Sequence, residues 1–301
     1  MLLILLLLLV VTNGCNILAL SGGGAHGAFQ GGVLNKLQTE NKKWNIITGV
    51  SAGSLNGIML AMYTPSEQQK GINVIKDVWL NITTADVYRW NWNPIYDQSI
   101  LDNTPLNNTI NSLAYKYGGV AKRDIIIGSV NFNTGLLRLF NRSEFSNPRR
   151  TSDIVMASSS IPVIFPPRFL DNNYYVDGGT FSNEIIRPAI QYCLDKGYNK
   201  DDINIDIIIC TPPISKITNS EISKDHTYGI GLRAYDIASS ALSNHELYTH
   251  CGKNQEAYKM YIYKPNQPYL GSLLDFSHDI LVKTFEMGYN VTQPIESKYC
   301  Y

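Results

Sequence analysis

The sequence lacks an excess of either charge, because 25 lysine and arginine residues balance 25 aspartate and glutamate residues. It also lacks any basic run longer than a pair such as Arg149-Arg150. A chain without a basic stretch has no electrostatic means of searching for nucleic acid, so we expect no nucleic-acid partner. A neutral surface still allows contact with a membrane, provided that the contact is hydrophobic or local.

The five cysteines lack the spacing of a metal site, since no two of them form a C-x-x-C pair. Cys193 and Cys210 lie in apolar segments, where we expect them to be plain core residues. If the chain is secreted, one or two disulfides can form among Cys15, Cys193, Cys210, Cys251 and Cys300. The odd number leaves at least one thiol over.

Residues 2–11 form an unbroken apolar run that lacks a basic residue before it. The run is too short to span a bilayer as a helix, which needs about 20 residues. Its length and the small residues near Gly14 are typical of a secretory signal. We predict a signal peptide or hydrophobic leader over residues 1–14, with the chain in the secretory pathway or secreted, or membrane-associated. A buried first strand or helix, or lipid attachment at Cys15, are the competing interpretations.

The chain has no repeat, no low-complexity linker and no break in composition, so we expect one domain over residues 15–301. Short apolar runs at 16–20 and 46–50 read as buried strands, and helical patterns over 28–39 and 52–63 follow them. This alternation predicts an α/β fold of three layers, with a mainly parallel central sheet and helices on both faces.

The rest of the chain continues the alternation with less regularity. Patterns predict helices over 67–80, 151–160, 184–196, 229–247 and 275–289, and strands over 124–131, 136–140, 174–176, 203–210 and 260–264, the last strand. Residues 90–105 are rich in Trp, Asn, Tyr and Pro and are expected to form an ordered loop. Its first part, 90–96, is either simply packed or a lid or membrane contact.

The strongest local signal is Gly49-Val50-Ser51-Ala52-Gly53 between a predicted strand and a predicted helix. G-x-S-x-G in that context is a nucleophile elbow, in which a strained turn projects the serine at the start of the helix. The amides and dipole of the helix N-terminus favour negative charge there. The alternative is an ordinary helix cap with Ser51 as the N-cap residue.

A glycine-rich turn precedes the first helix. Its Gly22, Gly24 and Gly27 fit the G-x-G-x-x-G pattern of a dinucleotide site. That site needs an acidic residue at the end of the second strand, where this chain has Gly49-Val50-Ser51, so we expect no nucleotide. Bare amides in such a turn can instead stabilise the oxyanion that forms in acyl transfer. The alternative is a glycine turn that only closes a tight connection.

A carboxylate follows a short predicted strand at Val176-Asp177-Gly178-Gly179. On its own this segment is an ordinary turn signal. A serine nucleophile needs a base, however, and no histidine lies close to Ser51 in the sequence.

These three motifs, in this order, resemble the patatin-like phospholipase family. The matching stretches are residues 18–29 (LALSGGGAHGAF), 49–53 (GVSAG) and 177–179 (DGG), with weaker similarity at 157–167 and from 273 to 289. The resemblance implies a patatin-like fold and a metal-independent lipid acyl hydrolase of the phospholipase A or lysophospholipase type, with no cofactor. Its substrates would be acyl lipids, reached at a membrane surface.

The resemblance also implies site residues. Ser51 would be the nucleophile and Asp177 its base, while the amides of Gly22, Gly23 and Gly24 would form the oxyanion hole. The remaining motif residues are His26, Gly27, Gly49, Gly53, Gly178 and Gly179. His26 stands where the family often has Arg or Lys, so either it lowers the positive field and shifts the pH dependence, or it is a polar turn residue. Asn183-Glu184 is a second departure, since the family usually has an Asn-rich stretch with proline after the aspartate; it puts no catalytic role in doubt.

Three alternatives remain open from the sequence. The first is a conventional triad of Ser51, Asp177 and one of His226, His245, His250 or His278. The second is a non-catalytic lipid-binding module on the same fold. The third is acyl transfer to an alcohol through the same acyl-enzyme. The sequence makes no prediction of oligomeric state.

Overall fold

The structure, a computed structural model, describes residues 14–93, 96–214, 216–224, 226–247, 257–291 and 293–300. Apart from Gly14, the predicted leader lies outside these residues, as does Cys251. No helix among these ranges is both long and apolar enough to cross a bilayer.

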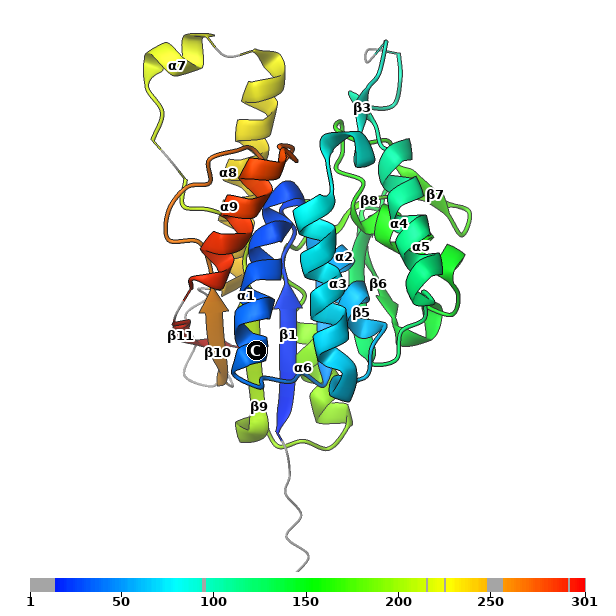
Figure 1. The fold of residues 1–301 in the computed structure, drawn as a ribbon, viewed down its shortest axis with the longest axis vertical. Helices are drawn as coiled ribbons and strands as arrows, with labels where there is room; N and C mark the ends of the chain where they lie inside the picture. The colour runs from blue at the N-terminus through cyan, green and yellow to red at the C-terminus, as the bar shows by residue number, and fades with distance from the viewer. Residues whose placement is uncertain are drawn as a thin grey trace, which may run out of the picture.

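A nine-stranded sheet forms the centre of the molecule (Figure 1), with the order β11-β10-β9-β1-β2-β5-β8-β7 and with β6 beside β5. The five strands from β10 to β5 pair in parallel, and β11, β6, β7 and β8 add antiparallel pairs at the margins. The strands are β1 (Cys15–Leu20), β2 (Ile46–Val50), β5 (Asp124–Asn131), β6 (Leu136–Asn141), β7 (Arg168–Leu170), β8 (Asn173–Asp177), β9 (Ile203–Ile208), β10 (Ala257–Tyr263) and β11 (Ile295–Cys300).

Helices cover both faces of this sheet. Side chains of β1 alternate between two cores, since Leu18 and Leu20 belong to the larger one while Ile17 and Ala19 belong to the smaller. The larger core packs against α1 (Gly27–Thr39), α2 (Ala52–Ala61), α3 (Gln68–Asn81), α4 (Thr104–Tyr117), α5 (Pro148–Ser158) and α9 (His278–Tyr289). The smaller packs against α6 (Arg187–Asp195) and the end of α8 (Thr227–Leu247), which follows the short α7 (Asn219–Lys224). The predicted three-layer α/β architecture is confirmed.

Several elements differ from the prediction. The expected loop over 90–105 contains the small hairpin β3 (Arg89–Trp90) and β4 (Leu101–Asp102), and α4 follows where no helix was predicted. Helix α4 is rich in Asn and buries only one residue per turn, at Leu106, Ile110 and Ala114, so its apolar pattern is weak.

The C-terminal end of the chain also differs from the prediction. Strand β11, rather than β10, is the last strand, and its polar sequence fits its place at the edge of the sheet. The short elements β7 and α7 were not predicted either, and α6 begins at Arg187 rather than at Glu184.

Strands β2 and β8 occupy the same edge of β5, one after the other. Strand β2 pairs with β5 up to Val50 opposite Gly128, and β8 takes over with Asp177 opposite Ser129. Since β6 pairs with both of these parts of β5, it must lie along the other edge. This arrangement brings Asp177 to the point where β2 ends and Ser51 follows.

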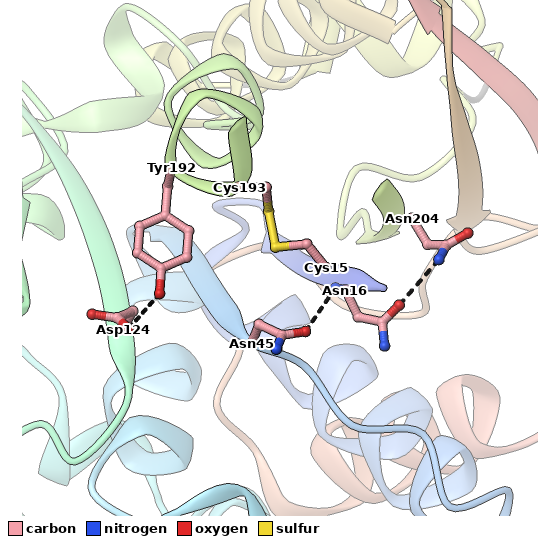
Figure 2. Close-up of a disulfide and its surroundings, with 7 residues drawn as sticks. All are labelled: Cys15, Asn16, Asn45, Asp124, Tyr192, Cys193 and Asn204. Atoms are coloured by element: carbon pink, nitrogen blue, oxygen red, sulfur yellow. Dashed lines mark hydrogen bonds between the residues drawn. A yellow bond between two sulfur atoms is a disulfide. The ribbon is translucent and has the colours of Figure 1, made fainter. Parts of the chain in front are cut away.

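A disulfide joins Cys15 at the start of β1 to Cys193 in α6 (Figure 2). Both cysteines are fully buried in the smaller core. Cys193 is a core residue, as predicted, but the prediction that it is a plain one is wrong, because it forms a disulfide. An apolar segment does not show whether a second cysteine lies opposite it in the fold. The bond also occupies the Cys15 sulfur, which is then not available for lipid attachment. Cys210 is a buried free cysteine, as predicted.

Candidate active site

Ser51 sits in the sharp turn between β2 and α2, with φ 52° and ψ −124°. A positive φ is uncommon for a residue with a side chain and is strained. Gly49 and Gly53 make the turn possible, since a Cβ at Gly49 would collide with the carbonyl of Gly53, and one at Gly53 with that of Leu20. The Ser51 side chain makes no capping hydrogen bond to α2, so the interpretation of Ser51 as an ordinary N-cap residue fails.

The end of α5 fixes the backbone on both sides of the site. The Ser51 N–H donates to the Ser158 hydroxyl at 3.0 Å, and that hydroxyl donates to the Gly128 carbonyl at 2.6 Å. Two residues further on, the Ser160 carbonyl accepts the Asp177 N–H at 2.8 Å. Ser158 was not among the site residues predicted from the sequence, although it lies in the stretch of weaker family similarity at 157–167.

Asp177 is completely buried at the end of β8. Its Oδ1 accepts the Gly179 N–H at 2.8 Å, while Oδ2 has no hydrogen-bond partner of ordinary geometry among the described residues. Burial raises the pKa of Asp177 to about 7, and the Ser51 hydroxyl and the Gly179 N–H only partly offset this by favouring the charged form. The Ser51 hydroxyl is thus near enough to the Asp177 carboxyl to influence its pKa.

The glycine loop lies against Ser51, because a Cβ at Gly22 would be 3.1 Å from the Ser51 Cβ. The N–H of Gly22 is already used, since it donates to Asn183 Oδ1 at 3.1 Å. The N–H groups of Gly23 and Gly24 have no partner among the described residues. Gly24 has a φ of +54°, a conformation that favours glycine.

Asn183 connects this loop to α8. Its Nδ2 donates to the Ser243 hydroxyl at 3.3 Å, and that hydroxyl donates to Glu184 at 2.8 Å. Burial, together with the neighbouring Glu246, raises the pKa of Glu184 well above its ordinary value. The Asn183-Glu184 pair therefore holds the glycine loop, a role that its departure from the family pattern did not predict.

His26 is buried beside the loop and stacks on Tyr269, with ring centroids 3.9 Å apart. Its Nε2 donates to the Gly271 carbonyl at 3.1 Å. Burial lowers the pKa of His26 to about 4, so the imidazole is neutral near pH 7. It is therefore a packed residue that anchors the glycine loop to the segment before α9, and not an exposed turn residue.

The other predicted glycines have packing roles around these residues. Gly27 begins α1 against the ring of Trp79, and Gly178 lies against the Gly128 carbonyl. Gly179 supplies the N–H that Asp177 accepts.

An apolar pocket opens beside Ser51 between α2, α3 and α4. The side chains that line it are almost all hydrophobic: Leu55, Trp79, Ile82, Val87, Leu106, Ile110, Ile161, Phe165, Leu274 and Phe276. Gly24 of the glycine loop and Ser51 itself complete the wall. Such a lining suits a hydrocarbon chain and offers a charged ligand nothing to bind.

Three of the four histidines considered for a triad, His226, His245 and His278, are exposed, whereas Asp177 is fully buried. None of them is among the groups that shift the pKa of Asp177. His250 lies outside the described residues. The geometry thus favours a pair of Ser51 and Asp177 over a triad with any of these three.

A strained serine at the carboxyl end of a parallel strand, a buried carboxylate and an apolar pocket beside them fit the class of lipid acyl hydrolases. The family model described as patatin-like phospholipase matches residues 18–190. The chain belongs to the patatin-like phospholipase family, which confirms the resemblance found in its motifs.

Proteins of similar sequence are also named as enzymes that act on lipids. The chain is 28% identical over 203 residues to "Probable lipid hydrolase 463L" of Invertebrate iridescent virus 6, covering 62% of this chain and 67% of that protein. It is 24% identical over 198 residues to a cGAMP-activated phospholipase of Escherichia coli (strain TW11681), covering 56% of this chain and 52% of that protein. The chain thus spans about half the length of the bacterial relative. Family and relatives together support the expected lipid hydrolase function.

Among solved structures, VipD from Legionella pneumophila is similar at 12% identity with a TM-score of 0.46. The alignment covers 93% of this chain and 66% of VipD.

Proposed function

We propose that this protein hydrolyses carboxylic esters of acyl lipids by a metal-independent mechanism, with Ser51 as nucleophile and Asp177 as base. One observation carries the proposal. At one edge of β5, the strained Ser51 meets a buried carboxylate whose Oδ2 lacks a partner among the described residues. A buried polar atom without a partner is costly, so its retention here favours a role in catalysis.

The first half-reaction transfers the acyl group to the enzyme. The Ser51 Oγ forms a bond to the ester carbonyl carbon while its proton passes to Asp177 Oδ2. A pKa near 7 suits this base, because the carboxylate is available at neutral pH and holds a proton well enough to return it. The bond to the lipid alcohol breaks, and the alcohol leaves with the proton from Asp177.

The second half-reaction reverses the roles. A water molecule loses its proton to Asp177 and attacks the acyl carbon, the Ser51 ester bond breaks, and the proton returns to Ser51. The product is a free fatty acid. In both halves the negative carbonyl oxygen would be stabilised by the N–H groups of Gly23 and Gly24. Gly22 has a different part in the proposal, since its N–H is bound to Asn183.

The apolar pocket would hold the acyl chain of the substrate. Its lining leaves the alcohol side of the ester, and with it the lipid head group, outside the pocket. This favours phospholipase A or lysophospholipase activity. One relative is named a probable lipid hydrolase and another a phospholipase.

We also propose that the protein acts in the secretory pathway or outside the cell. The buried disulfide between Cys15 and Cys193 supports this location, because such bonds persist mainly in oxidising compartments. The bond lies directly after the leader predicted for residues 1–14, so it would tie down the new N-terminus after cleavage.

Lipid release from a mixed phospholipid extract tests the proposed activity. Wild type, Ser51→Ala and Asp177→Asn are incubated side by side with EDTA present, and products are identified by mass spectrometry. We expect free fatty acids from wild type only. Undiminished release by Ser51→Ala, or loss of wild-type activity in EDTA, would refute the mechanism.

A further inference from the structure

The molecule has a group of exposed apolar side chains around the approach to the pocket. They come from the β3–β4 hairpin, from the α5–β7 connection and from α7 and α8: Trp90, Trp92, Tyr96, Val163, Ile222 and Ile230. We call this group the apolar rim. Figure 1 shows β3, α7 and the start of α8 projecting beyond the carboxyl end of β1, the end of the sheet at which Ser51 lies.

The two sides of the rim are in contact. The ring of Trp90 in β3 lies 5.4 Å from the ring of Tyr228 in α8, centroid to centroid. On the hairpin side, the N–H of Ile100 donates to the carbonyl of Val163 at 2.8 Å. These contacts join the hairpin to the start of α8 and to the α5–β7 connection, although the three segments are far apart in the sequence.

The rim is also continuous with the apolar pocket. Val87 and Leu274 line the pocket, and the hydroxyl of Tyr88, next to Val87, donates to the Leu274 carbonyl at 2.9 Å. Trp90 of the rim lies only two residues beyond Tyr88. Near Val163, both Ile161 and Phe165 line the pocket. Val163 itself has a φ of +71°, a strained conformation for a β-branched residue, and its side chain is exposed.

Packing does not account for the exposed aromatic residues of the hairpin. Trp92 is fully exposed, Tyr96 is 85% exposed and Trp90 is 60% exposed. The other two tryptophans of the chain, Trp44 and Trp79, are buried in the core. Trp and Tyr favour the boundary between water and hydrocarbon, where the ring is buried and the polar group stays wet.

We propose that the apolar rim is the surface by which the protein docks on a lipid bilayer, with the pocket facing the membrane. The proposal rests on the proposed lipid hydrolase function, because a membrane substrate explains why apolar side chains are exposed next to the pocket. The rim side chains are uncharged, and the neighbouring Arg89 is paired with Asp102 at 2.6 Å. Burial of apolar area would therefore drive the docking, and zwitterionic lipid is sufficient.

Vesicles of phosphatidylcholine test this proposal. In a Ser51→Ala background, which preserves the lipid, we expect a blue shift of tryptophan fluorescence and quenching by brominated acyl chains. Trp44 is buried and does not line the pocket, whereas Trp79 does, so the change is assigned to Trp90 and Trp92 by its loss in the variant W90S/W92S. Binding should change less than twofold between low and physiological salt, as expected for apolar contact.

Variants of the aromatic residues in the hairpin test whether these residues bind the vesicles. We expect the triple variant W90S/W92S/Y96S to lower the vesicle-bound fraction at least about tenfold in sedimentation, and W92S alone to lower it less. The control is Tyr115→Ser, which removes an aromatic residue of 65% exposure from the far end of α4. W92S keeps the Trp90–Tyr228 contact and remains informative if the triple variant does not fold.

Activity separates this proposal from the proposed function. On the catalytically intact chain, the hairpin variants should lose vesicle hydrolysis but keep hydrolysis of a soluble butyrate ester within about twofold. No binding of wild type to the vesicles, or equal loss of binding in Tyr115→Ser, would overturn the docking surface. Absence of soluble-ester hydrolysis by wild type would instead overturn the proposed function, whatever the vesicles show.

Discussion

The backbone N–H of Ser51 donates to the hydroxyl of Ser158, 107 residues away in the chain, at 3.0 Å. The same hydroxyl donates to the carbonyl of Gly128, so a single side chain from α5 ties the strained turn to β5. A strained backbone persists only where its surroundings fix it, and Ser158 is the part of those surroundings that mutation can remove without touching the substrate.

Ser158→Ala should slow turnover about tenfold or more while leaving KM nearly unchanged, since the substrate pocket is intact. The free energy of unfolding should fall by about 1–3 kcal/mol, because the Ser51 N–H loses its buried partner. The control is Ser152→Ala on the same helix, where a buried hydroxyl has no partner among the described residues. Steady-state kinetics and urea unfolding measure both effects, and equal kinetics for the two variants would remove Ser158 from the site.

The raised pKa of Asp177 predicts the pH dependence of activity. Because the carboxylate is the active form of the base, kcat/KM should rise with pH and level off above about 7. His26 does not contribute to this profile, since its pKa of about 4 keeps it neutral throughout. A profile measured with a soluble ester that is flat from pH 5 to 9 would contradict the assignment of Asp177.

The same shift has a consequence for stability. In the folded state the pKa of Asp177 is about 7, above its ordinary value near 3.8. The folded protein binds this proton more tightly than the unfolded chain does. The free energy of unfolding is therefore highest below about pH 3.8, and it falls by about 4 kcal/mol as the pH rises to 7. Asp177→Asn does not titrate, so its stability relative to wild type should increase from pH 5 to pH 8. Urea unfolding at several pH values measures the difference, and a constant difference would contradict the burial argument.

The pocket predicts a dependence on chain length. Ile110→Trp places a larger side chain in the wall and should reduce hydrolysis of long-chain esters about tenfold or more, with little effect on a butyrate ester. The added volume costs stability, about 1–3 kcal/mol, so folding is checked by thermal unfolding. Equal loss for short and long chains would show that the acyl chain binds elsewhere.

The disulfide predicts sensitivity to reductant. Reduction of the bond between Cys15 and Cys193 should lower the free energy of unfolding by about 2–5 kcal/mol, because the bond closes a long loop of the chain. The double variant Cys15→Ala/Cys193→Ala should already have the lower stability and should not respond to reductant. A similar response in wild type and double variant would mean that this bond is absent in solution.

The motifs at the start of β-to-α turns were predictable because they depend on local geometry. Gly49, Ser51 and Gly53 indicate a sharp turn that only small residues allow, and the structure places that turn as expected. The meeting of Asp177 with Ser51 was not predictable from the residues alone. It depends on β2 and β8 sharing one edge of β5, a register that no local pattern of Asp177 reveals.

Contacts between distant segments were also hidden in the sequence. Ser158 and Asn183 look like ordinary polar residues until the fold places them against Ser51 and Gly22. Helix α4 was missed because its apolar spacing is sparse, although Pro105 at its start and Gly118 at its end were usable signals.

Labelling with a fluorophosphonate tests the central claim, the pair of Ser51 and Asp177, most directly. Peptide mapping of folded wild type should find one adduct, on Ser51, formed at a rate that rises with pH to a plateau above about 7. Asp177→Asn should fold and label at least about a hundredfold more slowly. An adduct on another residue, or unchanged labelling of Ser51 in Asp177→Asn, would contradict the proposed pair.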